Sequence, residues 1–173
     1  MENVINVVVG RPGSGKTSWA CQEAITLAAD VNNIVIYIGR QQELERIVSE
    51  REYAGRGNLR FAGIPNAGAA IGSAIDLANA VEDENGQHDS DKAPHQMVYL
   101  FYDQCRCDAF HGRRDILEAA AKAGVIVYVI CQSFEQVDKG DVEWLKKNCR
   151  CMVISKGRPP RNALPDEMMS KYR

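Results

Sequence analysis

Short runs of apolar residues alternate with longer amphipathic stretches along most of this chain. The apolar runs are rich in Val and Ile and are bounded by Gly or by polar residues, which is typical of strands that are buried on both faces of a sheet. They predict strands at Val4–Val9, Ile34–Ile38, Leu59–Ile64, Met97–Tyr102, Val125–Cys131 and Cys151–Ser155.

Between these runs, apolar residues recur at helical spacing. They predict helices at Lys16–Ala29, Gln41–Tyr53, Pro65–Val81, Asp115–Ala123 and Val142–Asn148. The acidic segment Glu82–Asp91 is expected to be a solvated loop. Because strands alternate with helices, we expect an α/β fold with a mostly parallel sheet and helices on both of its faces.

The composition is that of a globular protein. The 173 residues are 45% hydrophobic. They include 21 Lys and Arg and 23 Asp and Glu, which gives a net charge of -2. This balance excludes a uniformly basic nucleic-acid coat protein, although it allows a local basic patch. No apolar run approaches the ~20 residues of a membrane span, so none is expected. The start at Met1 and Glu2 lacks the basic region of a signal peptide.

Basic residues concentrate in the last part of the chain. Beside the acidic residues Asp166 and Glu167, this part contains the basic residues Lys146, Lys147, Arg150, Lys156, Arg158, Arg161, Lys171 and Arg173. Prolines in the same part prevent one long helix, because proline interrupts the helical hydrogen bonds. We expect a globular domain over residues 1–158 and a basic, proline-containing C-terminal tail over residues 159–173.

A phosphate-binding loop follows the first predicted strand and precedes the first predicted helix. It matches the pattern G-x-x-x-x-G-K-[ST], and the expected nucleotide-binding residues are Gly10, Arg11, Pro12, Gly13, Ser14, Gly15, Lys16, Thr17 and Ser18. Glycines let backbone N–H groups turn toward the phosphates, and the helix N-terminus adds its dipole. Lys16 is expected to reach the β- and γ-phosphates of ATP, and Thr17 to hold Mg²⁺.

Polar residues end two later strands. Asp103 follows Met97–Tyr102, at the position where P-loop proteins hold the magnesium shell. Gln104 comes next, where many P-loop ATPases have Glu as the base; a glutamine orients a water molecule but cannot take its proton. Gln132 directly follows Val125–Cys131 and is expected to contact the γ-phosphate or its water. The alternative is that Gln132 merely ends its strand.

This order of parts resembles the FtsK/HerA group of RecA-like P-loop ATPases. The matching pieces are GRPGSGKT, MVYLFYDQ and VIVYVICQSFEQVD, and the resemblance runs from Val4 to about Ile154. The stretch AAAKAGVIVYVICQSFEQ is similar to the group's helix, strand and terminal glutamine. The pair Asp103-Gln104 departs from the acidic pair that is usual in the group, so slow or partner-dependent hydrolysis is expected.

Within this group, the compact chain most resembles the genome-packaging ATPases of tailless viruses with an internal membrane. The resemblance implies an ATP- and Mg²⁺-dependent motor, assembled as a homo-oligomeric ring, that moves double-stranded DNA into a preformed capsid. Its further partners would be a capsid vertex or membrane-associated viral proteins. It would work in the cytoplasm of the host cell or at the packaging vertex of the virion.

Ring ATPases of this kind use an arginine of the neighbouring subunit to stabilise charge on the transferred phosphoryl group. The candidates are Arg106, Arg113, Arg114 and Arg150, of which Arg113 and Arg114 stand in a loop that is expected at a subunit edge. The alternative for each is an ordinary surface arginine. A ring that moves DNA must also neutralise backbone phosphates, and we expect the Arg51–Arg60 loop and the basic tail to do so.

Two Cys-Arg-Cys triplets, Cys105–Cys107 and Cys149–Cys151, raise the possibility of zinc. Alternate thiols share one face of a strand, so four sulfurs could meet around one ion. The pairs lack zinc-knuckle spacing. Small buried side chains beside the sheet are therefore the favoured interpretation.

Other functions stay open at this point. GRPGSGKT would also suit a small-molecule P-loop kinase, and Gln104 would suit a nucleotide-dependent assembly factor that does not hydrolyse. The family resemblance also leaves open a zonular-occludens-toxin-like phage assembly ATPase. The long segment between Thr17 and Asp103 and the position of Gln132 favour an extra strand between the two site strands, which is the RecA-like order. This order argues against the kinase.

Overall fold

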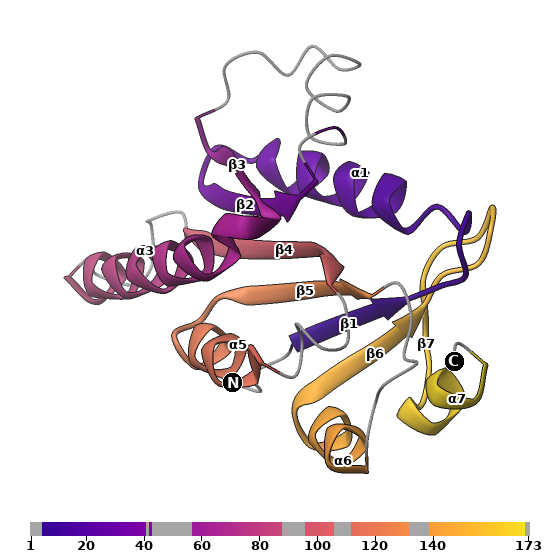
Figure 1. Cartoon of the computed structure of the whole chain (residues 1–173). Helices are drawn as coiled ribbons and strands as arrows, with labels where there is room; N and C mark the ends of the chain where they lie inside the picture. The colour runs from indigo at the N-terminus through magenta and orange to yellow at the C-terminus, as the bar shows by residue number, and fades with distance from the viewer. Residues whose placement is uncertain are drawn as a thin grey trace.

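The computed structural model describes residues 5–40, 42, 57–87, 96–105, 112–131 and 139–171. They form a seven-stranded sheet in the order β3-β2-β4-β5-β1-β6-β7 (Figure 1). Its strands are β1 (Ile5–Val9), β2 (Asn33–Gly39), β3 (Leu59–Gly63), β4 (Met97–Cys105), β5 (Ile126–Cys131), β6 (Cys149–Val153) and β7 (Arg161–Asn162). All neighbouring strands are parallel except β7, which runs antiparallel to β6.

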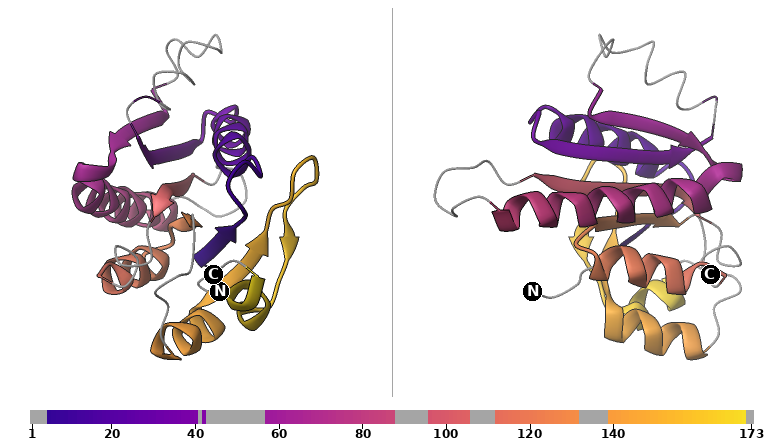
Figure 2. Two further views of the ribbon diagram at one scale, coloured as in Figure 1. Left: turned by 45° about the vertical axis from the view of Figure 1, so that its right-hand side comes forward. Right: turned by 90° about the vertical axis from the view of Figure 1, so that its left-hand side faces the viewer.

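Helices cover both faces of the sheet (Figure 2). The described ones are α1 (Lys16–Ala28), α3 (Ala67–Gln87), α5 (Arg114–Lys122), α6 (Lys139–Asn148) and α7 (Pro165–Lys171), with a short 3-10 turn, η1 (Ile64–Asn66), before α3. Buried side chains of α3, α5, α6 and α7 share one core, and those of α1 share the other.

The pleat of each strand divides its residues between these two cores. In β1, Val7 and Val9 pack in the core that contains Leu117 of α5, whereas Val8 packs with Ala24 of α1. Successive strand residues point to opposite faces, and every residue of β1 is buried. This explains why the strand, apart from Asn6, is apolar throughout rather than alternating.

The order of the strands confirms the expected RecA-like α/β fold. β1 lies between β5 and β6, and β5 separates it from β4. β1, β5 and β4 all run parallel, so their carboxyl ends meet at one edge of the sheet. Ligands of open α/β sheets bind outside this edge. The predicted strands are confirmed with end shifts of a few residues, the largest at β4, which ends at Cys105 rather than Tyr102.

The prediction of a loop from Glu82 is wrong as far as Gln87. Helix α3 continues to Gln87, and Glu82, Asp83 and Glu84 lie exposed on its last turns. The earlier turns of α3 are stabilised by their buried side chains. Because glutamate is a good helix former, the acidic run that follows continues the helix. Residues 88–91 of that expected loop lie outside the described residues, as does the helix expected at Gln41–Tyr53 apart from residue 42.

The segment that we expected to be a basic tail folds against the domain. β7 pairs with β6, and the side chain of Met168 in α7 is fully buried in the core shared with α6. The reversal between β6 and β7 passes through Gly157, whose φ of 72° is left-handed, a conformation that glycine adopts without steric cost.

Two further expectations concern metals and membranes. Among the described residues, no group of His, Cys, Asp or Glu has the arrangement of a metal site, and Cys107 and the side chain of Cys105 lie outside that part of the chain. Burial raises the pKa of the Cys151 thiol to about 11, and it also raises the pKa of Cys149. No described helix is long and apolar enough to span a bilayer.

Candidate functional site

The phosphate-binding loop connects β1 to α1 at the carboxyl edge of the sheet (Figure 1). Gly13 and Gly15 have φ values of 77° and 85°, and a Cβ at either position would meet nothing within 4 Å. Left-handed backbone, rather than lack of space, is therefore what requires glycine at these two positions. The first turn of α1 follows immediately, so its free N–H groups face the loop.

Gly10 is required for a different reason. A Cβ there would lie 2.5 Å from Ser14 Oγ and 2.8 Å from the carbonyl oxygen of Ile154. The backbone N–H of Ile154 donates to the carbonyl of Val9 at 2.8 Å. The start of the loop is thus pressed against the segment that follows β6.

Lys16 bends over the loop that precedes it. Its Nζ donates to the carbonyl oxygens of Gly10 at 2.5 Å and of Arg11 at 3.3 Å. The pKa of Lys16 lies below its ordinary value, because desolvation lowers it by more than the charge of Asp103 and the Cys131 thiol raise it. Asp103 and Cys131 at the end of β5 are therefore both within electrostatic range of Lys16.

Asp103 is fully buried near the end of β4. Tyr37 of β2 donates its hydroxyl to Asp103 Oδ2 at 2.6 Å, and the Cys21 thiol of α1 donates to Tyr37 Oη at 3.3 Å. Burial, with the nearby Asp103 carboxylate, raises the pKa of Tyr37 far above its ordinary value. The phenol therefore keeps its proton and acts as a donor to the carboxylate.

These residues fit a magnesium–nucleotide complex. Ser14 Oγ is a buried polar atom without a hydrogen-bond partner among the described residues, at the point where the loop would surround a phosphate. Asp103 and Thr17 offer the hard oxygen ligands that Mg²⁺ prefers. Arg11, Pro12 and Ser18 are exposed around the same loop, as expected of a site open to a ligand.

A cavity of about 360 Å³ opens beside the loop. One wall consists of Arg11, Pro12, Gly13 and Ser14, and the other of Ile154, Ser155 and Lys156 after β6. In Figure 1 the turn between β6 and β7 projects next to the start of α1. Sequence analysis missed this second wall and also Tyr37, because neither belongs to a local motif.

Several predicted site residues cannot be placed. Gln132, Arg106, and Arg51 and Arg56 of the expected DNA-binding loop lie outside the described residues, and of Gln104 only the backbone is described. The pairing of β4 with β5 shifts register between Tyr102 and Cys105, so the Asp103-Gln104 pair lies at an irregularity of the sheet. Such irregularities re-aim side chains next to active sites.

The two arginines before and at the start of α5 have different surroundings. Arg114 forms an ion pair with Asp141 of α6, whose side chain is 7% exposed, and lies over the Trp144 ring at 5.7 Å. Arg113 lies 5.9 Å from the centre of the Tyr102 ring and close to Gly68. Arg114 is thus bound to α6, whereas Arg113 lies beside an aromatic ring of β4 and the start of α3.

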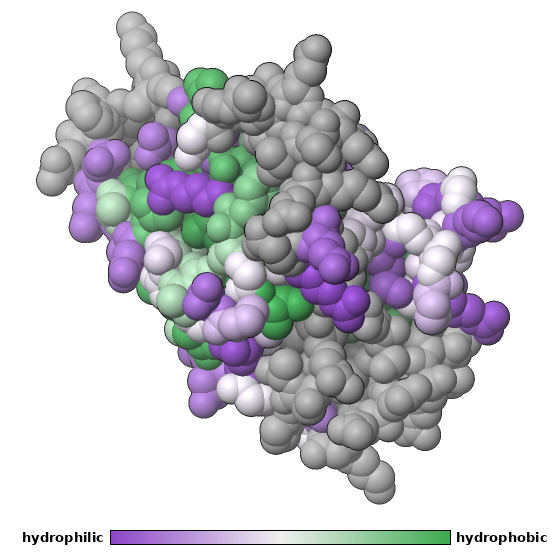
Figure 3. All heavy atoms as spheres, turned by 45° about the horizontal axis from the view of Figure 1, so that its top comes forward, coloured by the Kyte–Doolittle hydropathy of each residue, from purple (hydrophilic) through white to green (hydrophobic). Residues whose placement is uncertain are grey.

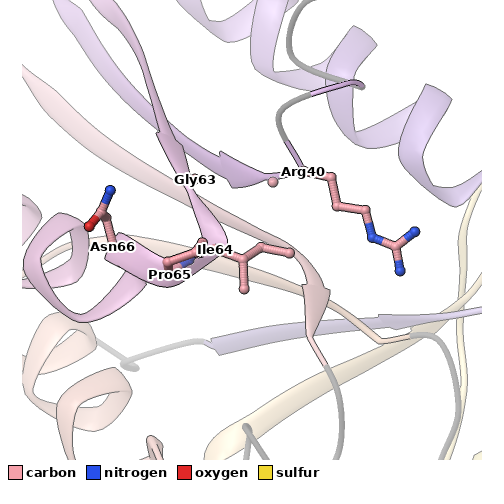
Figure 4. Close-up of a pocket in the computed structure, with 6 residues that line it drawn as sticks. Arg40, Gly63, Ile64, Pro65 and Asn66 are labelled. Atoms are coloured by element: carbon pink, nitrogen blue, oxygen red, sulfur yellow. The ribbon is translucent and has the colours of Figure 1, made fainter.

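A second cavity, of about 460 Å³, lies at the same edge of the sheet near the ends of β2 and β3. It is lined by Gly39, Arg40, Gly63, Ile64, Pro65 and Asn66. Figure 4 shows the Arg40 side chain extending away from Pro65 and Asn66. Figure 3 shows hydrophobic side chains gathered on one face among hydrophilic ones.

Several exposed basic residues of the C-terminal segment have polar partners. Lys146 lies 3.2 Å from Asp166, and Arg161 forms an ion pair with Glu167 at 2.6 Å. Arg150 donates to the Asn162 side chain. Lys156 and Arg158, in the turn between β6 and β7, are exposed.

Comparison with known proteins supports the fold. No protein-family model and no curated protein matches the chain. Among solved structures, a DnaB-like replicative helicase, described with its interactions with primase, matches with a TM-score of 0.53 and 12% identity over 94% of this chain and 54% of the helicase chain. ATPases 2 and 3 of EssC from Geobacillus thermodenitrificans match with a TM-score of 0.51 and 10% identity over 91% of this chain and 33% of theirs. The chain therefore spans about half of one and a third of the other, and shares their fold.

Proposed function

We propose that the chain is the motor domain of an ATP-hydrolysing, Mg²⁺-dependent ring that moves double-stranded DNA. One observation carries the nucleotide part of this proposal. A complete phosphate-binding loop at the end of β1 faces a buried Asp103 on β4, with β5 between the two strands. This spatial order, rather than the loop motif alone, supports the RecA-like type of ATPase.

Each residue then has a definable task. The loop N–H groups and the N-terminus of α1 hold the phosphates, and Lys16 leaves the carbonyls of Gly10 and Arg11 to stabilise charge on the β- and γ-phosphates. Thr17 and Asp103 would hold Mg²⁺, which supplies neutralisation of the phosphate charge. Gln104 and Gln132 are proposed to orient the attacking water, so hydrolysis is expected to be slow without a partner.

The DNA part of the proposal rests on the resemblance to genome-packaging ATPases and on the basic turn between β6 and β7. Similarity to a replicative helicase supports a ring. Packaging of a viral genome through a capsid vertex, in the host cytoplasm or in the virion, follows from the sequence resemblance. Of the other functions, a kinase is disfavoured because β5 separates β1 from β4. Gln104 keeps a non-hydrolysing assembly factor as the second candidate.

Phosphate release measured with and without double-stranded DNA tests the proposal. We expect release that DNA stimulates, and a loss of at least ~10²–10³-fold in the Lys16→Ala variant, the scale of removing one preorganised electrostatic contact. Circular dichroism of Lys16→Ala should match the wild type. Release only in the presence of a nucleoside acceptor would support the kinase instead, and nucleotide binding without release would support the assembly factor.

A further inference from the structure

We propose that Tyr37 is a positioning residue of the magnesium site, holding the Asp103 carboxylate in the orientation that the metal requires. The inference rests on the proposed function and adds to it a residue that belongs to no P-loop motif. It assigns a task to the buried chain of hydrogen bonds from Cys21 through Tyr37 to Asp103.

The sheet brings Tyr37 and Asp103 together although they are 66 residues apart. β2 pairs with β4 so that Tyr37 is opposite Phe101, and Asp103 follows two residues later on the same face of the sheet. The oxygen–oxygen distance is 2.6 Å, which is typical of a short, charge-assisted bond to a carboxylate. Both residues are at most 1% exposed, so water does not compete for this bond.

The ring of Tyr37 is held in place by other aromatic rings. It stacks on Phe101 with 5.8 Å between ring centres and 13° between planes, and its centre lies 6.4 Å from that of the tilted Phe61 ring. Phe101 stacks in turn on Tyr128 at 4.8 Å. The hydroxyl is therefore fixed by packing and not only by its hydrogen bonds.

The direction of the hydrogen bonds is also determined. A phenol has one proton to donate. Because the Cys21 thiol donates to Tyr37 Oη, the proton of Tyr37 is directed at Asp103. Cys21 lies on α1, the helix that begins with Lys16 and Thr17, so the chain of bonds connects the phosphate-binding element to the strand that carries the aspartate.

Groups that orient a metal ligand without touching the metal are worth about 10–100-fold in metal affinity. Removal of the Tyr37 hydroxyl should therefore weaken the binding of Mg²⁺, while the direct contacts of the loop to the nucleotide persist. We expect Tyr37→Phe to raise the Mg²⁺ concentration that half-saturates nucleotide binding by about 10-fold or more. Its affinity for a fluorescent ADP analogue in EDTA should equal that of the wild type.

The matched control is Tyr128→Phe. Tyr128 stacks on Phe101, as Tyr37 does, and the substitution removes a hydroxyl without removing the hydrogen bond to Asp103. Its Mg²⁺ dependence should equal that of the wild type. Titration with Mn²⁺, followed by electron paramagnetic resonance, gives a readout independent of turnover and should show the same difference between the two variants. An unchanged Mg²⁺ midpoint in folded Tyr37→Phe overturns the proposal.

A double-variant cycle separates positioning from general damage to the fold. In an Asp103→Asn background, Tyr37→Phe should cause no further change in the Mg²⁺ midpoint, because its effect passes through the carboxylate. An additional shift there would contradict the proposal. If Tyr37→Phe does not fold, Cys21→Ala is the second variant. It removes the hydrogen bond that directs the phenol proton at Asp103 without removing the ring, and an unchanged midpoint would then count against the proposal.

Failure of the proposed function has a different signature. A wild-type protein that does not bind the ADP analogue, with or without Mg²⁺, overturns both the nucleotide assignment and the role of Tyr37. Mg²⁺-dependent binding that is identical in the wild type and Tyr37→Phe overturns the role of Tyr37 alone.

Discussion

At the residue scale, the site depends on how much space the backbone leaves. Gly10 lies where three segments meet: the end of β1, the turn of the loop at Ser14, and Ile154 after β6. A flexible side chain could retreat from a new methyl group, but the carbonyl of Ile154 belongs to the backbone and is held by its neighbours. The same argument does not apply to Gly72, in the middle of α3, where a Cβ would meet nothing within 4 Å.

We therefore expect opposite results from two alanine substitutions. Gly10→Ala should destabilise the protein by about 1–3 kcal/mol, as overpacking does, and should abolish binding of the ADP analogue. Gly72→Ala should stabilise it by about 0.5–1 kcal/mol, because alanine loses less backbone entropy in a helix. Urea unfolding and nucleotide titration of both variants measure this, and equal stabilities would refute the argument from space.

Gln104 offers a test of the chemistry. Gln104→Glu supplies the carboxylate that many P-loop ATPases use as the base, so basal hydrolysis should rise or stay unchanged. Steady-state phosphate release without DNA is the measurement. Loss of turnover in a variant that still binds nucleotide would show that Gln104 positions a group that a charge disturbs.

The thiols of Cys149 and Cys151 in β6 predict a pH dependence of stability. The pKa of Cys151 is raised from 9.0 to about 11, and burial raises that of Cys149 as well. A raised pKa means that the folded protein holds the proton more tightly, so this stability is present below pH ~9 and is lost as the pH rises toward 11. The free energy of unfolding should therefore fall over this range, and less steeply in Cys151→Ala than in the wild type.

At the element scale, the C-terminal segment is the least expected part of the fold. Its composition is polar and rich in proline, yet α7 places Met168 in the main core at 0% exposure. Leu164, at the preceding turn, is 73% exposed. The buried Met168 and the pairing of β7 with β6 thus attach the segment to the rest of the domain.

This contrast gives a matched pair of variants. Met168→Ala should lower the free energy of unfolding by about 2–5 kcal/mol, the usual cost of emptying a buried site. Leu164→Ala should change it by less than about 0.5 kcal/mol, since an exposed side chain loses little. Chemical denaturation of both decides the point, and a small effect at Met168 would mean that residues 159–173 behave as a tail.

At the scale of the whole molecule, the nucleotide site lies at the edge of a single domain. A RecA-like domain of this kind is proposed to receive its arginine from the next subunit of a ring. Within the subunit, Arg114 already neutralises Asp141, and breaking such a buried pair typically costs about 3–5 kcal/mol. Arg113 lies beside the Tyr102 ring and Gly68 at the start of α3, neither of which carries a charge, which makes it the better candidate.

Mixing of inactive subunits tests this arrangement. Lys16→Ala and Arg113→Ala subunits should each be inactive alone, because an arginine finger is worth about 10³–10⁵ in rate. Mixed rings should regain part of the activity, since an intact loop then meets an intact arginine at some interfaces. A wild type that stays monomeric with ATP and DNA, and whose specific activity does not fall on dilution, would contradict the ring.

Local sequence determined the phosphate-binding loop. Its glycines, Lys16 and Thr17 lie within a few residues of one another, and the apolar run before them and the amphipathic run after them require a strand and a helix whatever the rest of the chain does. The alternation of strands and helices likewise determined a parallel sheet. Asp103 was found because a polar residue that ends a buried strand is conspicuous in the sequence.

Only the tertiary structure decided which distant residues complete the site. Tyr37 looks like any buried strand aromatic until the register of β2 against β4 places its hydroxyl on Asp103, and Ile154–Lys156 look like the end of a strand until β6 lies beside β1. The pairing of Arg114 with Asp141 depends in the same way on the packing of α5 against α6. Strand order and register are properties of the whole chain, because each is selected by the combined burial of all the elements and leaves no mark on the few residues that it brings into contact.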